Sequence, residues 1–360
     1  MSILFSPLTV RDLTLRNRLW VAPMCMYSAE DGMPGDWHHV HLAQFASGGA
    51  GLIIAEATAV VPEGRISPRD TGLWNDAQRD AWARIVTSIH ERGAAAGIQL
   101  AHAGRKASTW WPWAEGRRSV PLDDGGWQTV APSPIAYRGY AEPEALDAAG
   151  IDAIVEAFAA SAVRAVDAGF DVVEIHAAHG YLLHEFLSPL SNQRDDEYGG
   201  SLENRARLLL RVVRAVRAAV GAALPVFVRF SASDLAEGGH TVEDTATVAA
   251  WAAEAGADLF DISSGGLVAH QHIEVGPGYQ VPFAAHVRRE TGLVVTAVGA
   301  ITDGPQAEAI LESGDADAIF VGREWLRDPH LGLRAAAELT AAGLTADVDW
   351  PVQYARARWN

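Results

Sequence analysis

The chain alternates short apolar runs with longer stretches in which apolar residues recur every three or four positions. The first pattern predicts buried strands of a parallel sheet, and the second predicts amphipathic helices that cover it. Strands are expected at residues 19–23, 51–58, 97–101, 170–175, 225–230, 259–263, 294–298 and 318–321. Helices are expected at residues 39–47, 76–96, 152–168, 201–220, 241–255, 280–291, 303–313 and 329–342.

This alternation predicts an α/β fold, the (β/α)8 or TIM barrel, in a single domain over residues 1–360. An open doubly wound sheet is the alternative, but it has no natural reason to stop at eight units. Residues 1–18 are expected to form a hairpin that plugs one end of the barrel. Residues 102–149 show no clear period and contain Trp110, Trp111, Trp113 and Trp127. A loop insertion at about residues 103–149 is therefore expected to shape the substrate site.

Composition narrows the class of protein. Hydrophobic residues make up 49% of the 360 residues, and the formal net charge is −17, which argues against nucleic-acid binding. The sequence has neither a signal peptide pattern nor an apolar run long enough to span a membrane, so no membrane partner is expected. Cys25 is the single cysteine, which excludes an internal disulfide. These features predict a cytoplasmic protein.

The sequence EIHAAHGY at residues 174–181 directly follows an apolar run that reads as a strand. His176 and His179 could be core histidines, with Tyr181 covering apolar surface. They could instead be two ligands of a metal ion, but no third ligand is evident nearby, and we predict no metal site. In a third interpretation, the two imidazoles bind an oxygen atom of a substrate and the phenol supplies a proton.

Glycines follow the last two predicted strands, with Gly299 in the sequence VGAITDG and Gly322 in VGR. Many barrels bind a phosphate at these two loops, because glycine lets backbone N–H groups approach the oxygens and a helix N-terminus favours an anion. Arg323 can add a bidentate charge. Tight turns with a surface arginine are the alternative, but the agreement of both loops favours a phosphate site.

Other polar residues lie within apolar strands. Arg229 is the clearest case, because an unpaired cation is costly in such a strand. Its partner is expected to be either a carboxylate, with Glu56 and Glu174 as candidates, or the electron-rich edge of a ligand. Gln99 and the sequence SSGG at residues 263–266 could also contact a polar ring bound across the barrel mouth.

Together these stretches resemble the Old Yellow Enzymes, which are FMN-dependent ene-reductases, and in particular their bacterial thermophilic-like branch with the xenobiotic reductases. The resemblance covers nearly the whole chain. It rests on PMCMY at 23–27, GIQLAHAGRK at 97–106, HAAHGY at 176–181, LSPLSN at 187–192, YGGS at 198–201 and PVQY at 351–354. It implies a TIM barrel that binds FMN noncovalently, takes hydride from NADPH or NADH, and reduces activated alkenes such as enones, enals, maleimides and nitro compounds.

The resemblance also assigns cofactor contacts. The isoalloxazine wall would include Cys25, whose thiol would tune the flavin potential. Arg229 would lie beside N1 and O2 of the ring and stabilise the anionic reduced flavin. The implied cofactor-binding residues are Ala22, Pro23, Met24 and Cys25 along the ring, Ala57 and Gln99 at its pyrimidine side, Arg229, and Gly299, Gly322 and Arg323 at the phosphate.

On the substrate side, the resemblance implies that His176 and His179 bind the carbonyl or nitro oxygen and that Tyr181 donates the proton. Tyr27 would contact the substrate. Arg356 falls where this branch sends an arginine into the neighbouring active site, although Arg358 also fits, and a homodimer or homotetramer is implied.

Three other kinds of barrel remain as alternatives. Dihydroorotate-dehydrogenase-like or hydroxyacid-oxidase-like FMN barrels share the phosphate loops but lack the His-x-x-His-x-Tyr sequence. A phosphosugar isomerase or aldolase would use strand-end Glu or Lys and bind no flavin, and a non-enzymatic barrel would only bind its ligand. The dienoyl-CoA reductase relatives carry an iron–sulfur cluster, which one cysteine cannot hold.

Overall fold

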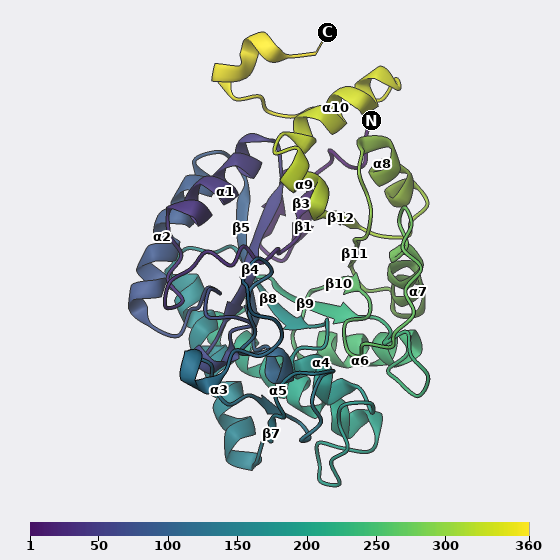
Figure 1. The fold of residues 1–360 in the computed structure, drawn as a ribbon. Helices are drawn as coiled ribbons and strands as arrows, with labels where there is room; N and C mark the ends of the chain where they lie inside the picture. Colours follow the sequence, from purple (N-terminus) through teal and green to yellow (C-terminus); the bar gives the residue numbers. More distant parts are fainter. Residues whose placement is uncertain (360) are drawn as a thin grey trace.

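The computed structural model describes residues 1–359 and contains a closed barrel of parallel strands surrounded by helices (Figure 1). The predicted TIM barrel is confirmed; residue 360, the last of the predicted domain, lies outside the described residues. Around the barrel the order is β3-β4-β5-β8-β9-β10-β11-β12, and β12 pairs with β3. The strands are β3 (Leu19–Val21), β4 (Leu52–Ala59), β5 (Ala95–Ala101), β8 (Val172–Ala177), β9 (Val226–Ser231), β10 (Leu259–Ser263), β11 (Val295–Ala297) and β12 (Ala318–Val321).

The outer helices connect successive strands, as the right-handed crossover of parallel strands requires, except that α10 follows the last strand. They are α1 (Asp36–Ser47), α2 (Asp76–His90), α3 (Ala148–Asp167), α5 (Leu202–Val220), α6 (Val242–Ala255), α7 (Val281–Thr291), α8 (Gly304–Glu312) and α10 (Leu331–Ala341). Polar residues begin several of them: the side chains of Ser201, Thr241 and Asp303 each accept a hydrogen bond from a backbone N–H in the first turn.

Side chains alternate between the two faces of each strand, and this alternation places the site. Ile53 packs outward against the helices, whereas Leu52 and Ile54 point into the barrel. At the lower end the interior is filled by Trp20, which packs edge-on against Phe320 with ring centroids 5.3 Å apart. Polar inward positions nearer the carboxyl ends of the strands therefore face the barrel mouth.

The N-terminal hairpin consists of β1 (Leu8–Val10) and β2 (Leu13–Leu15). Val10 and Leu15 are buried in the same cluster as Trp20, inside the barrel. The predicted plug at one end of the barrel is therefore confirmed, and the site is confined to the other end.

The predicted helix at 76–96 is wrong at its C-terminal end. α2 ends at His90, Gly93 has a φ of +75°, and Ala95 already belongs to β5. An alanine-rich run suits either a helix or a strand, and pairing of Ala95 with Leu52 across the sheet decides for the strand. The helix predicted from residue 152 begins earlier, at Ala148, because the Asp147 side chain accepts from the Gly150 N–H.

Two short helices and a small sheet were not predicted. They are α4 (Leu182–Leu187), α9 (Arg323–Arg327), and the sheet of β6 (Val130–Ala131) with β7 (Glu144–Ala145). The β6–β7 sheet lies in the segment at about residues 103–149, the predicted insertion, which also contains the short 3-10 helices η2 (Gly104–Lys106) and η3 (Leu122–Asp124). The insertion packs on the preceding loop, where Arg65 lies over the Trp127 ring and Arg69 over the Trp111 ring.

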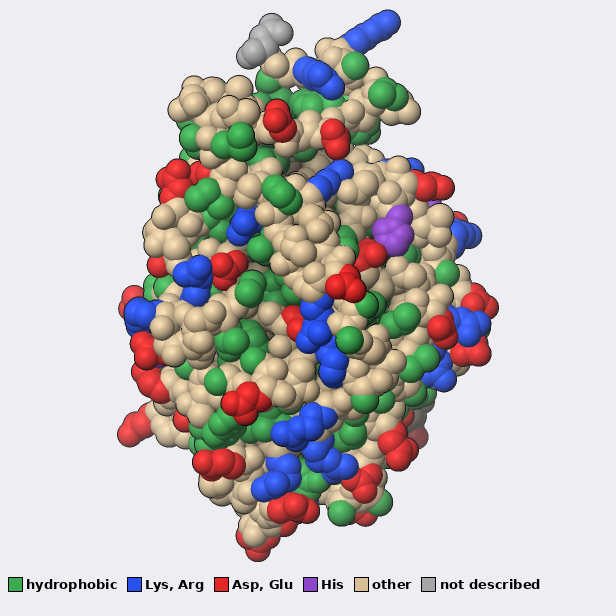
Figure 2. Space-filling view, turned by 180° about the vertical axis from the view of Figure 1, so that it is seen from behind, with side chains coloured by type: hydrophobic (Ala, Val, Ile, Leu, Met, Phe, Trp, Pro, Cys, Tyr) green, Lys and Arg blue, Asp and Glu red, His purple; other side chains and the backbone are tan. Residues whose placement is uncertain are grey.

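On the face shown in Figure 2, acidic and basic side chains are interspersed. Several of the surface arginines are paired, for example Arg211 with Asp152 at 2.6 Å. None of the helices within residues 1–359 is both long enough and apolar enough to cross a membrane.

Candidate active site

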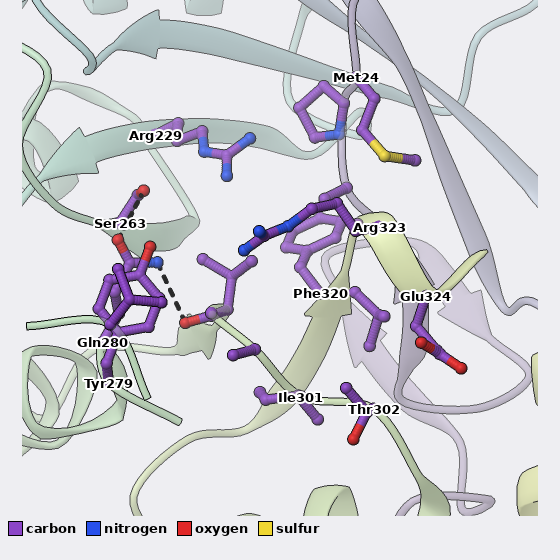
Figure 3. A pocket seen from close by; sticks show the side chains of 18 of the residues that line it. Met24, Arg229, Ser263, Tyr279, Gln280, Ile301, Thr302, Phe320, Arg323 and Glu324 are labelled. Carbon is purple, nitrogen blue, oxygen red and sulfur yellow. Dashed lines mark hydrogen bonds between the residues drawn. The ribbon is translucent and has the colours of Figure 1, made fainter. Parts of the chain in front are cut away.

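A cavity of about 460 Å³ lies at the carboxyl ends of β3, β9, β10, β11 and β12 (Figure 3). This is the end of a TIM barrel that carries ligand and catalytic residues. The fold brings together seven of the ten residues predicted to bind a cofactor, which line this cavity: Ala22, Pro23, Met24, Arg229, Gly299, Gly322 and Arg323.

One end of the cavity is suited to an anion. Gly299 has a φ of +119°, and a Cβ there would lie 2.9 Å from Nε2 of Gln280, so only glycine fits. Arg323 is exposed, makes no ion pair with any residue in 1–359, and reaches into the cavity in Figure 3. Its neighbour Arg327 differs, because Glu324 pairs with it at 3.0 Å. A guanidinium with no ion-pair partner within residues 1–359, beside the turns at Gly299 and Gly322, fits a phosphate.

The inward positions one layer below form a buried polar group. Nε of Arg229 lies 2.9 Å from Oδ2 of Asp261, and Nε2 of Gln99 donates to Oε1 of Glu174 at 2.8 Å. Of the two alternatives for Arg229, the carboxylate is present, but it is Asp261 and neither of the candidates Glu56 and Glu174. The strand register explains this, since Asp261 is paired directly with Arg229 across β9 and β10.

These contacts set the charges in that layer. Burial and then the nearby Asp261 raise the pKa of Glu174 to about 8, although Arg229 and Gln99 lower it. Burial likewise raises the pKa of Asp261, and Arg229 partly offsets this. Oε2 of Glu174 has no hydrogen-bond partner among the described residues. The guanidinium of Arg229 therefore meets one carboxylate on one side and the cavity on the other.

Glu56 is turned away from Arg229 by an irregularity in β4. The pairing of β4 with β5 shifts between Ala55 and Ala57, so that Ala57, not Glu56, is opposite Gln99. The Glu56 carboxylate instead accepts from the Met26 N–H at 2.9 Å and lies 3.2 Å from Nε2 of His38. Glu56 thereby fixes the backbone between Cys25 and Tyr27.

Next to the cavity, an apolar wall of small side chains brings three predicted residues together. The wall consists of Ala57, Ile66, Ala101, Ala103 and Ala107, and Cys25, Tyr27 and Tyr181 pack against it with Trp127. Burial first, and then Asp70 and Glu56, raise the pKa of the Cys25 thiol. The thiol is therefore neutral at physiological pH.

The residues of the sequence at 174–181 gather beside this wall. The ring of His176 lies 5.0 Å from that of Tyr181 and 5.3 Å from that of His179, centroid to centroid. His176 points inward at the end of β8, paired with Arg229 across β9. His179 and Tyr181 follow in the turn before α4. The three side chains therefore lie together, with Tyr181 against the apolar wall and His176 and His179 next to the cavity residues Arg229 and Ser263.

The environment keeps all three groups neutral. Burial, and then the charge of Arg229, lower the pKa of both His176 and His179 well below its ordinary value. Burial raises the pKa of the Tyr181 phenol well above its ordinary value. Each imidazole thus carries one proton, which it can donate in a hydrogen bond, and the phenol keeps its own.

Ser231, which the sequence did not single out, and Ser263 of the sequence SSGG orient His179. Its Nε2 lies 2.7 Å from Oγ of Ser263, and its backbone N–H donates to Oγ of Ser231 at 2.9 Å. Oε1 of Gln280 accepts from the Ser264 hydroxyl at 2.7 Å and from the Ser263 hydroxyl at 3.2 Å. Nδ1 of His179 has no hydrogen-bond partner within residues 1–359 and can face a ligand.

Two further residues predicted to bind the substrate, Tyr27 and Arg356, lie apart from each other in the structure. Tyr27 has a φ of +49° and its ring packs edge-on against Trp113 of the insertion, with centroids 5.9 Å apart. Arg356 lies in the exposed 3-10 helix η4 (Val352–Ala357). Residues of η4 and of the segment just before it line a groove together with Arg16 and Arg92, and Arg92 precedes the start of β5. Arg356 is therefore far from the mouth of its own barrel. Within the described chain, no group of His, Cys, Asp or Glu is arranged to hold a metal ion.

A family model, sequence relatives and a solved structure all relate the chain to the same group of flavin oxidoreductases. Residues 3–341 match the model of the NADH:flavin oxidoreductase / NADH oxidase family. An NADPH dehydrogenase of Bacillus subtilis (strain 168) is 47% identical over 356 residues, with 98% of each chain covered. One from Geobacillus thermodenitrificans (strain NG80-2) is 48% identical over 358 residues, covering 99% of this chain and 98% of the other. The solved Old Yellow Enzyme homologue from Zymomonas mobilis superposes with a TM-score of 0.78 at 31% identity, covering 99% and 98% of the two chains.

Proposed function

Because the chain belongs to the NADH:flavin oxidoreductase / NADH oxidase family, the family of the Old Yellow Enzymes, we propose that its barrel mouth reduces the C=C bond of activated alkenes. The protein is an NAD(P)H-dependent flavin oxidoreductase, and its cofactor is FMN. The alternatives of a phosphosugar isomerase, an aldolase or a barrel that only binds ligand are therefore set aside. The alkenes proposed are enones, enals, maleimides and nitro compounds.

The cavity residues fit FMN. Gly299, Gly322 and the unpaired Arg323 would hold the phosphate, and Arg229 would face the polar edge of the ring. Gln99 and Ala57, which are opposite each other on β5 and β4, would contact its pyrimidine side, and the segment from Ala22 to Cys25 would form its wall. When bound, FMN relays a hydride from the reduced nicotinamide to the alkene.

His176 and His179 would donate hydrogen bonds to the carbonyl or nitro oxygen of the alkene. Negative charge develops on that oxygen as the β-carbon accepts hydride, so preoriented neutral donors in a dry site stabilise the transition state. Tyr181 would supply the proton to the α-carbon, and its raised pKa keeps that proton available. Tyr27 would contact the substrate from the side of Trp113.

One observation supports this proposal most strongly: two neutral imidazoles and a protonated phenol are packed beside one another at the edge of the cavity. The test is anaerobic NADPH oxidation with a panel of enones, enals, maleimides and nitroalkenes, with the saturated product identified. Stoichiometric formation of saturated product is expected. NADPH turnover with oxygen or quinones and with no alkene of the panel would contradict the proposal.

The Cys25 thiol would lie near the reactive edge of the flavin and tune its potential, and a reducing cytoplasmic location would preserve it. Because the thiol is neutral and half-buried, Cys25→Ser changes its polarity and polarisability with little change in volume. A measurable shift of the flavin midpoint potential and an altered KM for the alkene are expected. An unchanged potential would remove this role.

The C-terminal arm would complete the site of a neighbouring subunit in a homodimer or homotetramer, with Arg356 as the residue that enters it. The support is that η4 is exposed and Arg356 does not reach the mouth of its own barrel. Arg358, the second candidate, is the matched control. Arg356→Ala should raise the KM for the alkene while Arg358→Ala leaves it unchanged; the reverse pattern would transfer the role to Arg358, and a monomer in solution would exclude both.

A further inference from the structure

The turn that carries His179 and Tyr181 has an unusual backbone. His179 and Gly180 both lie in the left-handed region, with φ values of +59° and +73°, and Tyr181 then returns to extended geometry as the N-cap of α4. A non-glycine residue in that region is held there by its surroundings. The direction of both site side chains therefore depends on the contacts that fix this turn.

Several groups fix the His179 side of the turn. Ser231 accepts from the His179 N–H at 2.9 Å, and Nζ of Lys106 donates to the carbonyl oxygens of both His179 and Gly266. A Cβ on Gly180 would lie 2.4 Å from the Gly266 oxygen, so the two loops are in direct contact. None of these contacts involves the N–H of Gly180.

The Gly180 N–H is fixed by a side chain from the next helix. It donates to Nδ1 of His184 at 2.9 Å, and His184 is fully buried in the first turn of α4. Since Nδ1 accepts this hydrogen bond, the ring proton is on Nε2. Nε2 lies 2.9 Å from Oδ1 of Asp234, which is also fully buried.

Asp234 is in turn anchored as an anion. Its Oδ2 accepts from the Ser188 hydroxyl at 2.6 Å and from the His240 N–H at 2.7 Å. Burial alone would raise the pKa of this carboxyl, but His184, Ser188 and the His240 N–H together hold it below its ordinary value. A carboxylate at this point favours the ring orientation that presents Nδ1 to Gly180.

We infer that His184 and Asp234 form a positioning pair that fixes the Gly180 amide and thereby holds His179 and Tyr181 in place for the alkene. The inference rests on the proposed function, because it assigns the pair to the alkene step. His184 touches neither cavity nor substrate. Its removal should impair alkene reduction and the binding of phenols at the oxygen site, and should leave the reaction with NADPH unchanged.

Two substitutions separate the contacts of His184. The Oδ1 of asparagine takes the place of Nδ1, so His184→Asn keeps an acceptor for Gly180 and loses the contact with Asp234. The amide of glutamine extends to the position of Nε2, so His184→Gln keeps a partner for Asp234 and loses the acceptor. Both replace the ring by a neutral amide, and asparagine removes one methylene more than glutamine, so loss of volume alone would make His184→Asn the more damaging change.

The experiment measures each half-reaction by stopped-flow absorbance, the Kd of 4-hydroxybenzaldehyde by titration, and the unfolding midpoint. His184→Gln should slow the reaction with cyclohexenone and weaken phenol binding roughly 10- to 100-fold, as expected for a misplaced catalytic group. His184→Asn should stay within about threefold of the unaltered enzyme. The reaction with NADPH should be unchanged in both.

Equal losses in the two variants, losses in both half-reactions, or failure of His184→Gln to fold where His184→Asn folds would show a structural role and overturn the inference. Two further outcomes separate it from the proposed function. An unaltered enzyme that reduces no alkene and binds no phenol defeats the proposed function itself. An effect of His176→Ala without one of His184→Gln defeats only the positioning pair.

Discussion

The β8–β9 side of the barrel mouth and its β11–β12 side are built by different means. On the first, His176, His179 and Tyr181 are held by neighbouring side chains and neutral through burial. On the second, Gly299 and Gly322 line the cavity without a side chain, and Arg323 remains exposed and unpaired within residues 1–359.

The difference reflects two physical tasks. A phosphate carries its full charge before and after binding, so an accessible cation and backbone N–H groups are sufficient to bind it. An oxygen that gains charge only in the transition state needs donors that are already oriented and shielded from water. Substitutions on the first side should therefore affect the rate of alkene reduction, and those on the second the affinity for FMN.

The largest effect is expected for Tyr181→Phe, which removes the proposed proton donor and keeps the ring against the apolar wall. Alkene reduction should fall roughly 10²- to 10⁴-fold, the usual contribution of general acid catalysis. The Kd of FMN and the rate of reaction with NADPH should not change. Stopped-flow kinetics with cyclohexenone measure the rate of alkene reduction. A wild-type rate in this variant would contradict the assignment of Tyr181 as the proton donor.

The opposite pattern is expected for Arg323→Ala. Loss of a charge-assisted contact with the phosphate should weaken FMN binding roughly 10- to 100-fold, measured by fluorescence titration of the apoprotein. Enzyme saturated with FMN should reduce alkenes at nearly the wild-type rate. Arg327→Ala is the matched control, because Arg327 lines the same cavity but is paired with Glu324. Equal losses in the two variants would mean that Arg323 has no special role.

Lowering the pH should affect the two sides of the barrel mouth differently, and the effect should be smaller than that of either substitution. The pKa of each site histidine lies well below 6.5 and that of Tyr181 well above 10, so none of them titrates between about pH 6 and pH 9. The alkene half-reaction should therefore show no midpoint from these three groups; a change near pH 8 would come from Glu174 or Lys106, each with a pKa of about 8. The affinity for FMN should instead weaken as the pH falls through about 6, where a phosphate monoester gains a proton. An alkene rate with a midpoint near pH 6.5 would show that a histidine acts in its charged form.

Much of the fold and of the site follows from local pattern. Each barrel strand is a continuous apolar run with its own boundaries, and the sequence HAAHGY brings three site residues together within six positions. Gly299 and Gly322 could be placed because a barrel puts all strand ends on one side.

The partners of these residues depend on register, which the sequence does not display. Asp261 is an inward position two residues before the end of β10, and only its pairing with Arg229 makes it the buried counter-charge. A carboxylate inside the apolar run at 259–263 was the available signal. His184 was hidden for another reason, since α4 spans only six residues and is too short to show a helical period.

The most direct test of the division between the two sides is His176→Ala, with both half-reactions and phenol binding measured on the same FMN-saturated preparation. Loss of one hydrogen-bond donor should slow alkene reduction roughly 10²- to 10³-fold and weaken the phenol complex, while the reaction with NADPH changes little. Equal losses in the two half-reactions, with phenol affinity unchanged, would contradict the account and show that the histidine pair only supports the fold.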